Sequence, residues 1–442
     1  MTGPTRHQLD ECAKRRARFM QIMGPDGVAI IPSAVEVTRN RDVHYRFRQD
    51  SDFRYLTGFL EPDAVAVLAP GRAAGEFVIF CRDRDALMEV WHGRRAGTEG
   101  AVAHFGADQA FVIEEFSEEL PALLADRKRL YYTFGEHGLD QEISACVREI
   151  REVSRRGAAA PEEFIGLESS LHEMRLIKSP AELELMRTAG QVSAQAHVKA
   201  MQLAAPGLNE YRIGAELHYE FEKHGMEPGY GSIIAGGENA CILHYTENNQ
   251  DLRDGELLLI DAGGEFQGYT ADITRTFPIN GKYSGPQRAL YEVVLAAQLA
   301  AIDTLRPENH CDAPHKKACE VLTEGLVALG LLQGDVRELI ASEAYKRFYL
   351  HGTGHWLGGD VHDVGRYKID GKHRRFEPGM VMTVEPGLYV PQGCEGVDPK
   401  FWGIGIRIED DIVVTPAEPE NLTAGVPKAI DEVEALMRDA AA

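Results

Sequence analysis

Apolar runs and helical periodicities along the chain predict two regions of different organisation. In the amino-terminal region, apolar runs with turn residues between them predict short strands at residues 28–31, 65–68 and 77–80. Apolar residues at helical spacing predict helices at residues 5–23, 120–125 and 139–150. The strands stand at intervals typical of βαβ units, so we expect an α/β domain with a mixed sheet.

The carboxy-terminal region begins with a helix start signal. Pro180 follows Ser179, and Glu182 completes a capping box with that serine. We place the domain boundary just before this helix, which predicts one domain of residues 1–172 and a second of residues 173–442, with 171–177 as the tether. Further patterns predict helices at residues 180–204, 209–225, 286–305 and 312–329, and a strand at 229–235.

The second domain contains a predicted hairpin that carries two carboxylates. Leu257–Ile260 is a continuous apolar run, glycines follow it, and β-prone residues resume at Ala271–Phe277. Asp261 and Asp272 are therefore expected on or beside strands, where a buried carboxylate is costly unless a positive charge meets it. Arg275 is the only nearby cation in the sequence. A metal ion would neutralise the two aspartates better.

Three further metal-ligand candidates follow in the second half of the chain. His355 lies in a histidine-rich loop, Glu385 directly follows the apolar run 380–384, and Glu409 lies in a β-prone stretch. Both glutamates are predicted at strand positions. Four strand-borne acids and one histidine make an oxygen-rich site, which suits a pair of divalent ions of the manganese type better than a tetrahedral zinc site. Turn positions or surface salt bridges explain one such acid better than they explain four.

Three histidines and one arginine complete the candidate site. His351 and His362 flank His355, so one loop gathers three imidazoles that a packed core would not need. The sequence leaves His244 open to two interpretations, a core residue or a functional one. Arg407 lies two residues before a candidate glutamate and is expected on the same strand face, where it would neutralise excess carboxylate.

The order of these residues resembles that of a known family. The pattern is similar to that of metallopeptidases with the pita-bread fold, most closely bacterial Xaa-Pro aminopeptidases (aminopeptidase P), in the series Asp261, Asp272, His355, Glu385 and Glu409, with His244, His351 and His362 around it. The run Arg48–Phe59 resembles their amino-terminal domain. From the residues alone, Asp50, Asp52 and Phe53 are expected in a loop that shapes the fold, with a contact to a substrate pocket as the alternative. The resemblance implies an α+β protein, with a pita-bread catalytic domain preceded by a smaller, creatinase-like α/β domain.

The resemblance also implies a metal content and a role for each ligand. Two divalent ions per chain, Mn²⁺ in the first place and otherwise Co²⁺ or Zn²⁺, would hold a hydroxide between them. Asp272 and Glu409 would bridge the ions. Asp261 would chelate one ion, and His355 and Glu385 would bind the other.

The implied activity is release of the first residue from peptides with proline at the second position. His362 and His244 would hold the scissile carbonyl region, His351 would border the pocket for the proline ring, and Glu385 would shuttle a proton. A prolidase, which cleaves Xaa-Pro dipeptides with the same ligands, is the alternative, and a non-catalytic peptide- or protein-binding relative is a remote one. Thr353-Gly354 replaces other small or apolar residues expected before the metal histidine, which we expect to affect the pocket wall.

Composition limits the partners and the compartment. The 442 residues carry a net charge of −22 without a basic patch, so nucleic acid is not an expected partner. Seven scattered cysteines without a C-x-x-C pair suit reduced thiols. The arginine-rich start lacks the apolar stretch of a signal peptide, and no apolar run approaches the roughly 18 residues of a membrane span. We therefore expect a cytoplasmic enzyme that acts on peptides away from membranes, as a homo-oligomer (dimer or tetramer).

Overall fold

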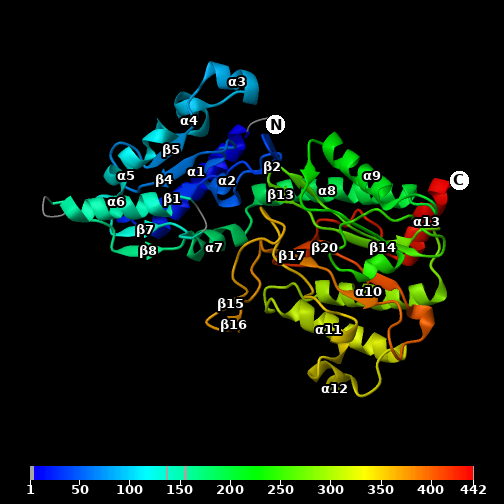
Figure 1. Cartoon of the computed structure of the whole chain (residues 1–442). Helices are drawn as coiled ribbons and strands as arrows, with labels where there is room; N and C mark the ends of the chain where they lie inside the picture. Colours follow the sequence, from blue (N-terminus) through cyan, green and yellow to red (C-terminus); the bar gives the residue numbers. More distant parts are fainter. Residues whose placement is uncertain (1–3, 136–137, 154–156, 442) are drawn as a thin grey trace. The chain divides into compact units, whose positions relative to one another are not determined.

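The chain separates into two compact units, and the division falls between Met174 and Arg175. The computed structural model describes residues 4–135, 138–153 and 157–441 (Figure 1). Within these ranges, the helices are all too short or too polar to cross a lipid bilayer.

A six-stranded mixed sheet forms the centre of the amino-terminal unit, in the order β6-β5-β4-β1-β7-β8. Its strands are β1 (Gly27–Pro32), β4 (Val65–Leu68), β5 (Phe77–Cys81), β6 (Gln109–Val112), β7 (Arg129–Tyr131) and β8 (Glu163–Ile165), and β2 (Thr38–Asn40) and β3 (Val43–His44) form a separate hairpin. The predicted mixed sheet is confirmed. The βαβ arrangement of the first three predicted strands was wrong, because β1, β4 and β5 pair antiparallel. Residues 69–76 are too few for a parallel crossover, which needs about a dozen residues.

Helices cover both faces of this sheet. Alternate residues of β1 pack into different cores. Val28 and Ile30 pack with the helices at Phe116–Leu124 and Asp140–Val153, whereas Ala29 and Ile31 pack with those at Arg6–Met23 and Ser51–Thr57. The helices of this part of the chain are α1 (Arg6–Met23), α2 (Ser51–Thr57), α3 (Ala86–His92), α4 (Gly97–Phe105), α5 (Phe116–Leu124), α6 (Asp140–Val153) and α7 (Leu171–Leu176), with short 3₁₀ turns at Ile113–Glu115 and Leu167–Ser169.

Two short helices lie where the sequence predicted a loop and a tether. Asp50 lies at the end of the loop that precedes α2 and caps the amino terminus of this helix, where its Oδ1 accepts the backbone N–H of Phe53 at 2.8 Å. The loop prediction was wrong for Asp52 and Phe53, which lie within α2. Asp52 lies in the first turn of α2 and pairs with His172 at 2.9 Å. The division between the two units falls within the tether predicted at 171–177, and most of this tether is the helix α7. Both helices are short, six or seven residues, and one or two turns leave too little periodicity to recognise.

The carboxy-terminal unit combines long helices with small antiparallel sheets. Its helices are α8 (Pro180–Leu203), α9 (Glu210–Lys223), α10 (Gly285–Ile302), α11 (Ala313–Ala328), α12 (Val336–Ala341) and α13 (Ile430–Ala441), with 3₁₀ turns at Gly237–Cys241, Ala344–Arg347 and Pro399–Phe401. The predicted start of α8 is confirmed: the side chains of Ser179 and Glu182 each accept the other's backbone N–H.

Five groups of strands complete this unit. Three-stranded sheets have the orders β10-β11-β14, β13-β12-β9 and β17-β20-β21, and two-stranded sheets are β18-β19 and β15-β16. The strands are β9 (Glu227–Pro228), β10 (Ile233–Gly236), β11 (Leu257–Asp261), β12 (Gly264–Phe266), β13 (Tyr269–Thr270), β14 (Thr274–Pro278), β15 (Lys368–Ile369), β16 (Lys372–His373), β17 (Val381–Val384), β18 (Gly387–Val390), β19 (Ile404–Arg407), β20 (Asp410–Val413) and β21 (Glu420–Asn421). The predicted hairpin is confirmed as β11 paired with β14, and its long loop contains β12 and β13.

Candidate active site

One cavity of the carboxy-terminal unit, with a volume of about 550 Å³, is lined by all nine residues that the sequence singled out. They are His244, Asp261, Asp272, His351, His355, His362, Glu385, Arg407 and Glu409. Tyr230, Ile233, Leu243, Thr246 and Val361 also line it, with the glycines at 231, 352 and 354. The cavity therefore joins segments that are far apart in the sequence.

The four acids lie where strands end. Asp261 is the last residue of β11, and Asp272 lies between β13 and β14. The two glutamates were predicted within strands, and this was wrong: Glu385 lies between β17 and β18, and Glu409 lies between β19 and β20. An acid just outside a strand is not bound to the alternation of strand faces, so its carboxylate can turn into the cavity.

Gly263 allows the hairpin to close tightly behind Asp261. A Cβ atom at this position would lie 1.7 Å from the carbonyl oxygen of Ala271, so a side chain would force the backbone apart. The close approach brings the segments that carry Asp261 and Asp272 together.

Three residues already present ligand atoms at the spacing of a metal site. Atoms of Asp272, His355 and Glu409 lie within 4.8 Å of one another. His355 Nε2 is 3.5 Å from Asp272 Oδ2 and 3.7 Å from Glu385 Oε1. The other ring nitrogen, Nδ1, is 3.0 Å from the carbonyl oxygen of Trp356, which fixes the ring so that Nε2 faces the carboxylates.

The pKa values of the site reflect an excess of buried negative charge. Burial and then the neighbouring carboxylates raise the pKa of Glu385 to about 7 and that of Glu409 well above its usual range. Burial would lower the pKa of His355, but Asp272 and Glu385 raise it to about 9. The four carboxylates thus favour any positive charge placed among them, as a site for cations must.

Arg407 is the cation that meets Asp261. Its Nη2 is 2.7 Å from Asp261 Oδ2, and its Nη1 donates to the hydroxyl of Tyr389 at 3.0 Å. Its Nε donates to Thr274 Oγ1 at 3.1 Å, and that hydroxyl in turn donates to Glu409 Oε2 at 2.6 Å. The expected neutralising contact of Arg407 is therefore present, and it is made to an aspartate of the hairpin.

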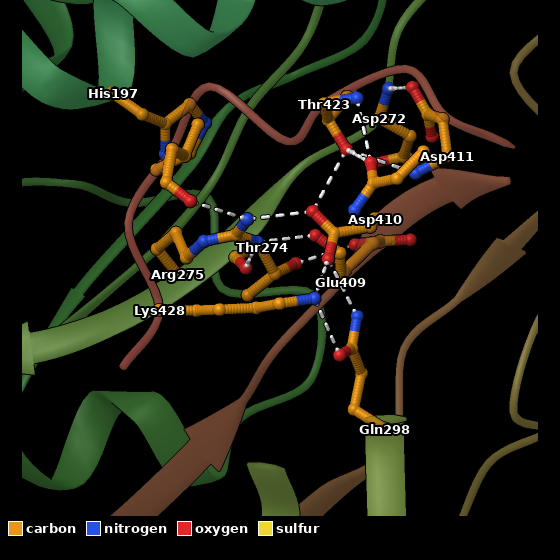
Figure 2. A network of polar contacts seen from close by, with 12 residues as sticks. His197, Asp272, Thr274, Arg275, Gln298, Glu409, Asp410, Asp411, Thr423 and Lys428 are labelled. Carbon is orange, nitrogen blue, oxygen red and sulfur yellow. Dashed lines mark hydrogen bonds and ion pairs between the residues drawn. The ribbon is translucent and has the colours of Figure 1, made fainter. Parts of the chain in front are cut away.

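Arg275, the cation that the sequence offered to the two aspartates, contacts a different acid. Its Nη2 lies 2.7 Å from Asp410 Oδ1, and its Nη1 donates to the carbonyl oxygen of Glu409 at 2.5 Å. Lys428 and Gln298 contact the other oxygen of Asp410 (Figure 2). This buried network holds the backbone beside Glu409.

The remaining imidazoles differ in their surroundings. His351 Nε2 is 2.8 Å from the Tyr389 hydroxyl, and burial together with Arg407 lowers the pKa of His351 to about 4, so this ring is neutral. The His362 ring packs edge-on against the His355 ring, with 4.4 Å between centroids. His244 is exposed in the wall of the cavity, which removes the core interpretation.

Sequence reasoning missed two tyrosines of the site. The Tyr230 hydroxyl is 2.7 Å from Asp261 Oδ1 and 2.5 Å from Asp272 Oδ1, and Tyr389 joins His351 to Arg407. Neither tyrosine stands in a pattern that separates it from a core residue. The pair Thr353-Gly354 was expected to affect the pocket wall, and Gly354 does line the cavity. Thr353 is buried outside the lining, and its hydroxyl lies 2.9 Å from His315 Nδ1.

The residues present fit divalent cations. Carboxylate oxygens from four acids and one oriented imidazole nitrogen converge in the cavity, a donor set that hard divalent ions prefer. Four carboxylates against the guanidinium of Arg407 leave a local excess of negative charge that one or two such ions would balance.

Comparison with known proteins gives the same picture over the whole chain. The profile of metallopeptidase family M24 matches residues 184–416, and that of the aminopeptidase P amino-terminal domain matches residues 12–131. The Xaa-Pro aminopeptidase of Escherichia coli (strain K12) is 46% identical over 430 residues, which are 97% of this chain and 97% of the relative. Human Xaa-Pro aminopeptidase 3 is 34% identical, over 98% of this chain and 85% of its own.

Solved structures agree in fold. The structure of Pseudomonas aeruginosa aminopeptidase PepP matches with a TM-score of 0.97 and 52% sequence identity, over 100% of both chains. Zinc-substituted E. coli aminopeptidase P in complex with product matches with a TM-score of 0.95 and 44% identity, over 99% of each chain.

These matches confirm the expected architecture, a pita-bread domain preceded by a smaller α/β domain, and they confirm that the protein is a metal-dependent enzyme. The chain belongs to metallopeptidase family M24 and carries the amino-terminal domain of aminopeptidase P.

Proposed function

We propose that this enzyme is an Xaa-Pro aminopeptidase, which hydrolyses the first peptide bond of peptides whose second residue is proline. The observation that carries the proposal is the cavity in which four carboxylates and one oriented histidine converge beside three further imidazoles. Relatives named Xaa-Pro aminopeptidase, which align with nearly the whole chain, support the same activity.

Two divalent cations, with Mn²⁺ as the expected ion, are proposed to bind to Asp261, Asp272, His355, Glu385 and Glu409. Such a pair lowers the pKa of a bound water and polarises the carbonyl that is attacked. Asp272, Glu409 and His355 would hold the ions together, since one ligand atom of each lies within 4.8 Å of the others. Arg407 and Tyr230 orient the carboxylate of Asp261 from two sides.

The remaining residues of the cavity are proposed to handle the substrate and the proton. Glu385, itself a proposed metal ligand, lies 3.7 Å from His355 Nε2 and 3.7 Å from His351 Nδ1. We assign it the transfer of a proton to the leaving amine. His362 and His244 line the cavity and are proposed to donate to the scissile carbonyl region. His351, neutral and held by Tyr389, would border the proline ring.

Charge in the cavity favours longer peptides over dipeptides. A dipeptidase needs a fixed cation for the free carboxylate that follows the proline. Arg407 is the one arginine or lysine among the described residues that line the cavity, and its three donor nitrogens face Asp261, Tyr389 and Thr274. No arginine or lysine among the described residues of this lining is therefore free for a substrate carboxylate, which supports the aminopeptidase over the prolidase.

Measurement of kcat/KM with three peptides tests the proposal. Xaa-Pro-Yaa should be hydrolysed at least about tenfold better than Xaa-Pro, a difference of about 1.4 kcal/mol in transition-state binding. Xaa-Ala-Yaa should be poorer still, because the pocket would lose its contacts with the ring. A preference for the dipeptide would assign the protein to the prolidases, and equal rates with proline and alanine would exclude both activities.

The proposal extends to domains, compartment and assembly. A division into domains of residues 1–172 and 173–442 is supported by the compact units, which separate between Met174 and Arg175. Cytoplasmic location is supported by seven free cysteines, as expected in a reducing compartment. Assembly as a dimer or tetramer rests on the family resemblance, and light scattering of the purified protein would measure it.

A further inference from the structure

Three charged side chains are buried together beside the loop that carries His362. The carboxylate of Asp363 lies between two cations, 2.8 Å from Lys178 Nζ and 2.7 Å from Arg175 Nη2. The side chains of Asp363 and Lys178 are each 1% exposed, and that of Arg175 is 5% exposed. Burial alone would raise the pKa of Asp363, but the two cations hold it below its usual range, so the carboxylate is charged.

The backbone at Asp363 is tied to the metal histidine. The N–H of Asp363 donates to the carbonyl oxygen of Trp356 at 2.9 Å, and His355 Nδ1 lies 3.0 Å from the same oxygen. The carbonyl oxygen of Trp356 therefore contacts both the ring of His355 and the backbone N–H of Asp363, at the end of the loop. The residue just before Asp363 is His362, whose ring packs against the ring of His355.

The turn between these points leaves no spare volume. A Cβ atom at Gly358 would lie 2.3 Å from a carboxylate oxygen of Asp363 and 2.6 Å from Lys178 Cε. The carbonyl oxygen of Gly358 accepts the N–H of Thr270, two residues before Asp272. The loop is therefore held at one end by the ion pairs of Asp363 with Lys178 and Arg175. Near its start, it is held by the hydrogen bond from Thr270, in the segment that carries the proposed metal ligand Asp272.

We propose that Asp363, held by Lys178 and Arg175, is a positioning residue that fixes the His362 ring against His355 at the height of the scissile carbonyl. Neither cation lines the cavity, so both act on the reaction through Asp363. The inference rests on the proposed function, because His362 is assigned to the substrate carbonyl there.

Geometry distinguishes this arrangement from a cluster that only stabilises the fold. Both cations converge on the residue next to His362, and the backbone N–H of that same residue shares an acceptor with His355. Release of the carboxylate should let the loop end move and the His362 ring leave its place, and a displacement of about 1 Å can lower a rate by about a hundredfold.

A double-mutant cycle tests the inference on the Mn²⁺-loaded full chain with an Xaa-Pro-Yaa peptide. Asp363→Asn should lower kcat by about tenfold or more with little change in KM. In the His362→Ala background, the same substitution should change kcat by less than about twofold, because the group that Asp363 positions is already gone. Equal losses in both backgrounds would overturn the inference.

Two controls separate this result from instability and from failure of the proposed function. Asp360 lies 2.6 Å from the same nitrogen of Arg175, and its own side chain is 36% exposed. Asp360→Asn removes the charge of this second carboxylate and should leave kcat within about twofold. If Asp363→Asn fails to fold, the double variant Lys178→Met, Asp363→Leu replaces the buried ion pair by apolar groups. It is then compared in the wild-type and His362→Ala backgrounds in the same way. A wild-type protein inactive on Xaa-Pro-Yaa would refute the proposed function, whereas an active one with additive losses would refute only the positioning role.

Discussion

His197 should make the stability of the carboxy-terminal unit depend on pH. The ring is fully buried in α8, its Nε2 is 2.8 Å from the carbonyl oxygen of Ala262, directly after Asp261, and its Nδ1 has no hydrogen-bond partner among the described residues. Burial, with Arg275 nearby (Figure 2), lowers the pKa of His197 from 6.5 to about 4. Protonation would place a charge and an unpaired N–H in the core.

The sign and the magnitude follow from this lowered pKa. Between about pH 6.5 and pH 4 the unfolded chain binds a proton that the folded chain does not, so stability is lost as the pH falls through this window. From about pH 7.5 to pH 5, the loss assigned to His197 is about 2 kcal/mol. His197→Gln keeps a donor toward Ala262 and removes the titrating group, so the variant should lack this part of the loss.

Urea unfolding at several pH values, followed by tryptophan fluorescence, measures the effect. Trp356 is fully buried in the carboxy-terminal unit, whereas Trp91 of the other unit is 75% exposed, so the signal reports mainly the unit of interest. The difference in free energy of unfolding between wild type and His197→Gln should shrink by about 2 kcal/mol from about pH 7.5 to pH 5. His104→Gln, at an exposed position of α4, serves as the control. A difference that stays constant with pH would refute the reasoning.

Three further predictions concern the metal ligands and their surroundings. Asp272→Ala and Glu409→Ala should lose bound Mn²⁺ in elemental analysis while His351→Ala keeps it, and a His351 variant without metal would reverse our assignment of ligand and substrate residues. Mn²⁺ added to metal-free protein at about a hundred times its Kd should raise the free energy of unfolding by about 2.7 kcal/mol for each site that it fills, and an unchanged thermal midpoint would argue against a site in the folded state. Asp410→Ala leaves Arg275 and Lys428 without their carboxylate and should cost about 3–5 kcal/mol in urea unfolding, whereas Asp431→Ala, whose side chain is 90% exposed, should stay within about 0.5 kcal/mol.

Local patterns explain why the ligand candidates were visible in the sequence. Asp261 follows a continuous apolar run, and Glu385 follows another, so each acid stands where a buried strand ends. A buried carboxylate at such a position requires a cation or a hydrogen-bond donor, and this requirement can be inferred from the sequence alone. The helix start at Ser179 could be predicted for the same reason, because its capping residues and Pro180 all lie within the first turn of the helix.

The partners of these acids were not visible, because they come from distant segments. Asp261 is met by Arg407, which is 146 residues away in the chain, whereas the neighbouring Arg275 reaches Asp410, 135 residues away. Tyr230 enters the site by the same kind of long-range contact, 42 residues from Asp272. Sequence spacing within one strand cannot choose among such partners, since the fold decides which strand ends meet.

Metal-restored release of the first residue from an Xaa-Pro-Yaa peptide tests the central claim most directly. The protein is stripped with a strong chelator, dialysed and assayed before and after Mn²⁺ is added, with Glu409→Gln treated in the same way. The account predicts no hydrolysis by stripped protein, recovery with Mn²⁺ as bound metal approaches two ions per chain, and no recovery for Glu409→Gln. Hydrolysis that survives metal removal, or full activity of Glu409→Gln without bound metal, would contradict it.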